Sequence, residues 1–78
     1  MKTPRGVSAD RLIRALQQLG YSVIRQKGSH VRLQHAGPPL HAITIPLHNP
    51  LKTGTLHGIL GEVAHARSCS IESIVELL

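Results

Sequence analysis

The chain has 78 residues, which is enough for one small domain (residues 1–78) and too few for a second hydrophobic core. Nine Lys and Arg against four Asp and Glu give a net charge of +5, which favours a polyanionic partner such as nucleic acid, although a merely solubilising surface would give the same count. The single cysteine excludes an internal disulfide, and no apolar run is long enough to cross a membrane, so we expect a cytoplasmic protein with no membrane partner.

An amphipathic helix is predicted to begin after Ser8 and to end at Gly20. Ser8 is a favourable N-cap, and Asp10 in the first turn interacts well with the helix dipole. Gly20 suits the left-handed conformation that often terminates a helix, with Tyr21 packing back onto the last turn. The apolar side chains recur with helical spacing: Leu12, Ile13, Leu16 and Leu19.

The hydrophobic period changes to two after this helix, which predicts a sheet of three antiparallel strands, over about residues 21–26, 30–35 and 41–47. The first turn is Lys27-Gly28-Ser29, where Gly28 can take a positive φ. The second turn is Gly37-Pro38-Pro39, which cannot continue a ladder. Pro46 indicates that the third strand lies at an edge of the sheet or ends there.

Alternation divides the predicted sheet into two faces. In the second strand Val31 and Leu33 face the core, while His30 and Arg32 share the opposite, polar face. In the third strand the isoleucines at 43 and 45 point inward and the threonine at 44 points outward.

Two more helices are predicted after the sheet. The first is capped by Thr53 or Thr55, and Ser70 caps a short last helix. The longer helix has a buried stripe of Leu56, Ile59, Leu60 and Val63, and its other side carries Gly54, Gly58 and Gly61, which we expect to admit another backbone, either an internal element or a partner chain. Helices on one face of a three-stranded meander give an α+β two-layer fold with the other sheet face free.

The basic turn at Arg25–Arg32 holds the most informative residue, His30. Gly28 permits close backbone approach, Ser29 can donate to a phosphate oxygen, and Arg25, Lys27 and Arg32 supply positive charge. An imidazole both accepts and donates protons near neutrality, so beside a phosphodiester it suits RNA cleavage through the 2′-OH. Two other roles of His30 remain open: it binds phosphate without catalysis, or it only begins the strand.

No metal site and no cofactor are predicted. None of the six histidines forms an HxH or HxxxH pair, and acidic ligands are sparse. His48 is a candidate second proton-transfer group or phosphate contact, and otherwise a loop residue. Lys52 precedes a helix start whose free amides could hold a phosphate or simply be capped.

The chain resembles the HicA toxin family, small mRNA interferases of toxin–antitoxin systems. The resemblance is carried by four blocks in the family's order: Leu12-Ile13-Arg14-Ala15-Leu16 with Gly20-Tyr21, Arg25-Gln26-Lys27-Gly28-Ser29-His30, Ile45-Pro46-Leu47-His48, and Lys52-Thr53-Gly54-Thr55-Leu56 with Ile59-Leu60. It implies a fold similar to the double-stranded-RNA-binding domain (dsRBD), a catalytic His30, and a HicB-type antitoxin that covers this histidine. The family often carries an aromatic residue after the turn, where this chain has Val31 and Leu33.

These observations lead to one prediction and two alternatives. The prediction is a metal-independent endoribonuclease toxin acting on mRNA, with His30 catalytic and RNA contacts from Arg25, Lys27, Gly28, Ser29, Arg32, His48 and Lys52. The first alternative is a non-catalytic RNA-binding module of dsRBD-like fold. The second is a protein-interaction domain with an acidic partner. Tyr21 is the only Tyr, Trp or Phe, so we do not expect single strands to be held by stacking on aromatic rings.

Overall fold

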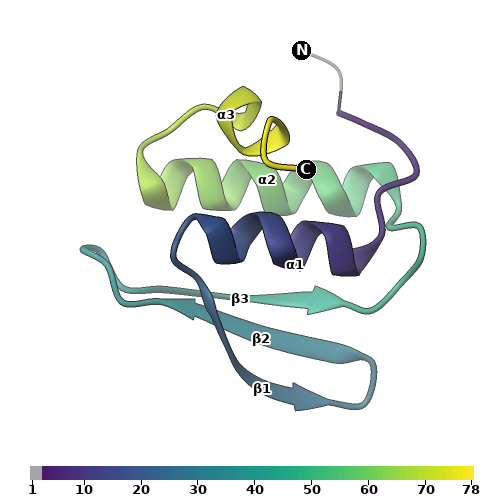
Figure 1. Cartoon of the computed structure of the whole chain (residues 1–78), viewed down its shortest axis with the longest axis horizontal. Coiled ribbons are helices and arrows are strands. Elements are labelled where there is room, and N and C mark those ends of the chain that lie inside the picture. Colours follow the sequence, from purple (N-terminus) through teal and green to yellow (C-terminus); the bar gives the residue numbers. More distant parts are fainter. Residues whose placement is uncertain (1–2) are drawn as a thin grey trace.

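The structure is a computed structural model that describes residues 3–78. Its elements follow the predicted order, helix, three strands, helix, helix, with these bounds: α1 Ala9–Gln18, β1 Ser22–Lys27, β2 His30–His35, β3 His41–Pro46, α2 Thr53–Arg67 and α3 Ile71–Val75. The strands form one antiparallel sheet in the order β1-β2-β3. All three helices lie on one side of this sheet (Figure 1), so the predicted α+β, dsRBD-like layout is confirmed.

The core lies between the sheet and the helices. Val31 and Leu33 of β2 and Ile43 and Ile45 of β3 are buried there, as the alternation predicts. The helices contribute a second set of fully or nearly fully buried side chains: Leu12 and Leu16 from α1, Leu56, Leu60 and Val63 from α2, and Ile74 from α3. Around these four strand residues the helix-facing side of the sheet is therefore apolar, and the other side is free for polar residues. We call that other side the outer face.

The end of α1 explains where the sheet begins. Gly20 has a φ of 102°, and the amides of Gly20 and Tyr21 donate to the carbonyls of Gln17 and Leu16, each at 3.0 Å, as in a Schellman cap. Tyr21 is buried and belongs to the cap, so β1 begins at Ser22 and not at Tyr21 as predicted. At the other end of α1, Ser8 accepts from the amide of Arg11 at 3.1 Å, which confirms the predicted N-cap.

One prediction about α2 is wrong, and for a second prediction one of two alternatives is excluded. Lys52 occupies the N-cap without a side-chain capping bond, and Thr53 and Thr55 are already helical. The reason is that Leu51 is buried and its amide donates to Val7 at 2.8 Å, which fixes the chain immediately before the helix. In the described part of the chain nothing lies within 4 Å of a Cβ built on Gly54, Gly58 or Gly61, so no internal element packs on that stripe, and a partner chain there stays a prediction.

The strand β1 is unlike the other two. All six of its residues are exposed, and the principal contacts between helices and sheet are those of α1 and α2 with β3. Figure 1 shows β1 as the edge strand that lies farthest from the helices. Its pairing with β2 has an irregularity between Val23 and Arg25, where Ile24 is an extra residue. β3 ends at Pro46 on the opposite edge, one residue short of the predicted end.

Candidate nucleic-acid site

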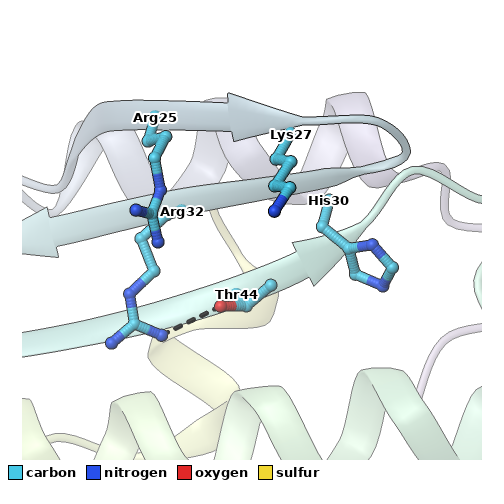
Figure 2. Close-up of a pocket in the computed structure, with 5 residues that line it drawn as sticks. All are labelled: Arg25, Lys27, His30, Arg32 and Thr44. Atoms are coloured by element: carbon cyan, nitrogen blue, oxygen red, sulfur yellow. Dashed lines mark hydrogen bonds between the residues drawn. The ribbon is translucent and has the colours of Figure 1, made fainter.

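A pocket of about 240 Å³ lies on the outer face of the sheet and receives residues from all three strands. Its lining consists of Arg25 and Lys27 from β1, His30 and Arg32 from β2, and Thr44 from β3 (Figure 2). The structure thus brings together four of the residues that the sequence singled out, Arg25, Lys27, His30 and Arg32. We call the five lining residues, Arg25, Lys27, His30, Arg32 and Thr44, the basic pocket.

The tight hairpin between β1 and β2 is what gathers these side chains. Lys27 pairs with His30 and Arg25 with Arg32, so all four point to the outer face. Only Gly28 and Ser29 separate the two strands, and Gly28 has a φ of 56°. Among residues 3–78 nothing lies within 4 Å of a Cβ at Gly28, which leaves the backbone of the turn open to a ligand. The Ser29 carbonyl accepts from Leu47 at 2.7 Å, which ties the turn to the end of β3.

Thr44 is the residue of the basic pocket that the sequence analysis did not single out. It pairs with Arg32 across β2 and β3, and the Arg32 guanidinium donates to its hydroxyl at 2.9 Å. Thr44 was predicted to point outward, but its importance depends on the register between two strands separated by an irregular turn. The hydroxyl accepts from Arg32 and keeps its own proton to donate to a ligand.

The charge around the basic pocket is positive without compensation. All four acidic residues of the chain, Asp10, Glu62, Glu72 and Glu76, lie in helices or at a helix end, and none lies in the sheet. No side chain of residues 3–78 forms a hydrogen bond with the imidazole of His30. His30 is exposed, so its ring is accessible to a ligand drawn to this face.

Two other predicted site residues lie outside the basic pocket. His48 lines a separate hollow beside the start of α1 with Leu47 and Asn49, and its carbonyl accepts from the amide of Ala9 at 3.1 Å. Lys52 is exposed at the start of α2. The Gly28–Ser29 turn, the end of β3 and the starts of α1 and α2 all lie at the same end of the molecule (Figure 1), so His48 and Lys52 belong to elements near the turn.

A second polar cluster lies on the helix side of the sheet, and its side chains form hydrogen bonds with other groups of the fold. Tyr21 donates to Nδ1 of His41 at 2.7 Å, and Nε2 of His41 donates to Glu62 at 2.9 Å. Arg67 donates to Nδ1 of His35 at 2.6 Å, and Nε2 of His35 donates to the Leu19 carbonyl at 3.0 Å. Arg67 also bonds the carbonyl of residue 39. We call Tyr21, His35, His41, Glu62 and Arg67 the inner network.

Burial raises the pKa of the Tyr21 phenol above its usual value of 10.0, and the nearby Arg67 guanidinium partly offsets this rise. Among residues 3–78, no three His, Cys, Asp or Glu side chains gather where they could hold a metal ion. In the same range no helix has the length and apolarity needed to cross a membrane.

The fold and the pocket define a small dsRBD-like α+β domain with a basic, helix-free sheet face. A family model, described as the HicA toxin of bacterial toxin–antitoxin, matches residues 9–64 of the 78. The chain therefore belongs to the HicA toxin family. Comparison with curated proteins and with solved structures gave no match.

Proposed function

We propose that this toxin is an endoribonuclease that cleaves mRNA without a metal ion and uses His30 as its catalytic residue. The observation that carries the proposal is the basic pocket, in which an exposed imidazole lies among Arg25, Lys27 and Arg32 with no carboxylate in the sheet. Membership of a toxin family supports a reaction that harms the cell. A HicB-type antitoxin that covers the basic pocket is the expected inhibitor.

The chemistry follows from one imidazole beside a phosphodiester. The 2′ oxygen loses its proton and bonds to phosphorus, and the bond from phosphorus to the 5′ oxygen breaks as that oxygen takes up a proton. His30 in its neutral form accepts the first proton, or in its charged form donates the second, and water carries the other. The products are a 2′,3′-cyclic phosphate and a 5′-hydroxyl.

The remaining proposed residues hold the RNA backbone. The cations of the basic pocket stabilise the negative charge that builds on the phosphoryl oxygens, and Thr44 holds Arg32 in place by accepting its hydrogen bond. Gly28 and Ser29 present the backbone of the turn to a phosphate. His48 and Lys52 extend the RNA path around the same end of the molecule. Contacts of this kind read phosphate and sugar, so we expect a loose sequence preference.

A second function, a non-catalytic RNA-binding module, is favoured by one observation. His30 donates no orienting hydrogen bond to another side chain of residues 3–78, whereas catalytic histidines commonly donate one to a carboxylate. In this alternative the imidazole is one more phosphate contact on the basic face.

The test is His30→Ala with purified full-length protein and a labelled mRNA transcript. We expect cleavage to fall at least about 100-fold, the usual contribution of a general acid or base, while RNA affinity changes little. His65→Ala is the matched control, because His65 is an exposed histidine on α2. Activity that survives in EDTA supports metal independence. Persistent cleavage by His30→Ala contradicts the catalytic role, and wild-type binding without cleavage supports the RNA-binding module.

A further inference from the structure

The strand β1 has an unoccupied edge. It is the first strand of the sheet order β1-β2-β3, so within residues 3–78 only β2 pairs with it. In the described chain, no backbone or side-chain group of Ser22–Lys27 forms a hydrogen bond outside that ladder. An edge strand directs a row of N–H and C=O groups to the solvent, and such a row is a template for another strand.

The two faces of this edge differ chemically. Arg25 and Lys27 point to the outer face and line the basic pocket. Val23 pairs with the core residue Leu33 and so points to the helix side, but it is 45% exposed because no helix covers it. Ile24, the extra residue, is 53% exposed. The edge therefore offers cations at one end and two aliphatic side chains at the other.

A second copy of this chain is a poor occupant. Antiparallel pairing of two β1 strands around Gln26 would set Arg25 of one copy opposite Lys27 of the other, and like charges across strands are destabilising. Each chain also carries +5. In such a pair Ile24 would lie opposite Gly28 of the other copy, beyond the end of its β1, and strand irregularities of this kind protect edges from self-association.

RNA is also a poor occupant of this edge, although it suits the outer face. Backbone N–H and C=O groups in alternation match another polypeptide, and the exposed side chains at 23 and 24 contact apolar groups better than phosphates. An extended peptide can pair with the free backbone groups of this edge. Its acidic side chains would lie opposite Arg25 and Lys27, and an apolar side chain would lie beside Val23 and Ile24.

We propose that the edge of β1 receives an extended acidic segment of a partner protein, which adds a fourth strand to the sheet. This deepens the proposed function and rests on it in one respect, because the natural source of the segment would be the antitoxin. A strand in this position borders the basic pocket, so its acidic side chains would neutralise Arg25 and Lys27 and exclude RNA from His30. Inhibition would then need no contact with the imidazole itself.

The experiment uses the full chain and a synthetic eight-residue peptide of alternating glutamate and valine with capped termini. Backbone amide exchange is followed by NMR, with a glutamate–proline peptide of equal charge as the control, because proline removes the strand donors. We expect the glutamate–valine peptide to slow exchange at amides of β1 and the proline peptide to leave them unchanged. Equal protection by both peptides would show that charge alone acts and would overturn the proposal.

Two variants locate the site. Val23→Lys should weaken binding of the glutamate–valine peptide about 10-fold and leave RNA cleavage unchanged, and Ile24→Lys should act in the same direction. Gln17→Lys, on the exposed side of α1, is the matched control and should bind the peptide normally. Unchanged binding by Val23→Lys and Ile24→Lys contradicts the proposal.

Two further results would overturn strand addition. One is protection of β1 that rises with protein concentration in the absence of peptide, which would identify a second copy as the occupant. The other is protection by an RNA oligonucleotide and not by the peptide. Peptide binding is measured without any cleavage assay, so this proposal and the nuclease proposal can fail separately.

Discussion

The basic pocket and the inner network are built from the same kinds of residue but differ in how their polar groups are satisfied. Each contains histidine and arginine on the sheet or next to it. In the inner network, His35, His41 and Arg67 each have partners within the fold and Glu62 supplies a carboxylate, while the buried Nε of Arg67 has no partner among the described residues. In the basic pocket the only hydrogen bond between side chains is that of Arg32 with Thr44.

The difference separates structural from binding roles. Buried polar groups must be paired inside the fold, because an unpaired one costs about 1–3 kcal/mol. Exposed cations carry no such requirement and remain available to an anion. We therefore expect substitutions in the inner network to lower stability, and substitutions in the basic pocket to lower RNA cleavage, with little crossover between the two.

After His30→Ala, the largest effect on cleavage is expected from Arg32→Ala. Loss of this guanidinium removes a cation that stabilises charge on phosphorus, so cleavage should fall roughly 10- to 100-fold. Thermal unfolding should change little, because Arg32 is part of the surface and bonds only the exposed Thr44. The measurement is a cleavage assay beside a circular dichroism melt. A large loss of stability with normal cleavage would reverse the assignment of this cluster.

Arg67→Met should show the opposite behaviour. It removes the bonds to His35 and to the carbonyl of residue 39, so the free energy of unfolding should fall by about 1–3 kcal/mol in urea titration. Cleavage at a temperature where the variant is folded should be normal. Arg67→Lys is the control that keeps the charge. It should recover only part of the stability, because an ammonium group cannot reproduce the two hydrogen bonds that the planar guanidinium makes to His35 and to the carbonyl of residue 39.

Thr44→Val tests whether Arg32 needs its partner. The loss of one hydrogen bond of about 1 kcal/mol should lower cleavage roughly five-fold, with RNA affinity less affected. Thr44→Ser keeps the hydroxyl and should restore activity. Equal losses in both variants would show that Thr44 acts through its shape and not through its hydroxyl.

Tyr21→Phe tests the inner network through pH. Burial raises the pKa of Tyr21 in the folded state, so the folded protein holds this proton more tightly than the unfolded chain. Stability from this group is complete below pH 10 and should fall as the pH rises above the unfolded value. The ultraviolet absorbance of tyrosinate reports Tyr21 alone, since the chain has one Tyr and no Trp. Tyr21→Phe should abolish this alkaline loss and cost about 1 kcal/mol at neutral pH.

The smallest effect concerns salt. Each phosphate contact to a single strand contributes about −0.7 to the slope of log affinity against log salt. Lys27→Ala should therefore make the slope of RNA binding shallower by about that amount. Arg14→Ala is the matched control, because Arg14 lies on α1 in an exposed ion pair with Asp10 at 3.0 Å. Equal changes in both variants would mean that RNA senses only net charge.

Most of the fold could be predicted from local patterns. The helical period of 3.6 residues and the strand period of two predicted the order of elements, and alternation in β2 correctly separated His30 and Arg32 from Val31 and Leu33. The errors arose where distant contacts decide. Lys52, and not a threonine, is the N-cap of α2, because Leu51 is held by Val7 from near the N-terminus.

The candidate site was predictable in part for the same reason. Residues 25–32 are close in sequence, so a two-residue turn is enough to gather them. Thr44 joins them only through the β2–β3 register, and His35, His41 and Arg67 pair across 20 residues or more, with no sequence spacing to signal it. Local turns can be inferred from sequence, whereas networks between separate elements depend on the completed fold.

The extra residue in β1, Ile24, determines where this strand can lose a residue without changing which side chains face the helices. Because Val23 pairs with Leu33 and Arg25 with Arg32, removal of Ile24 would leave every remaining pair of the hairpin in phase. Removal of Gln26 instead would place Arg25 opposite Val31 and turn it toward the helix side, away from the basic pocket. Ile24 is thus the position in β1 where the strand can lose a residue and still present the same two faces.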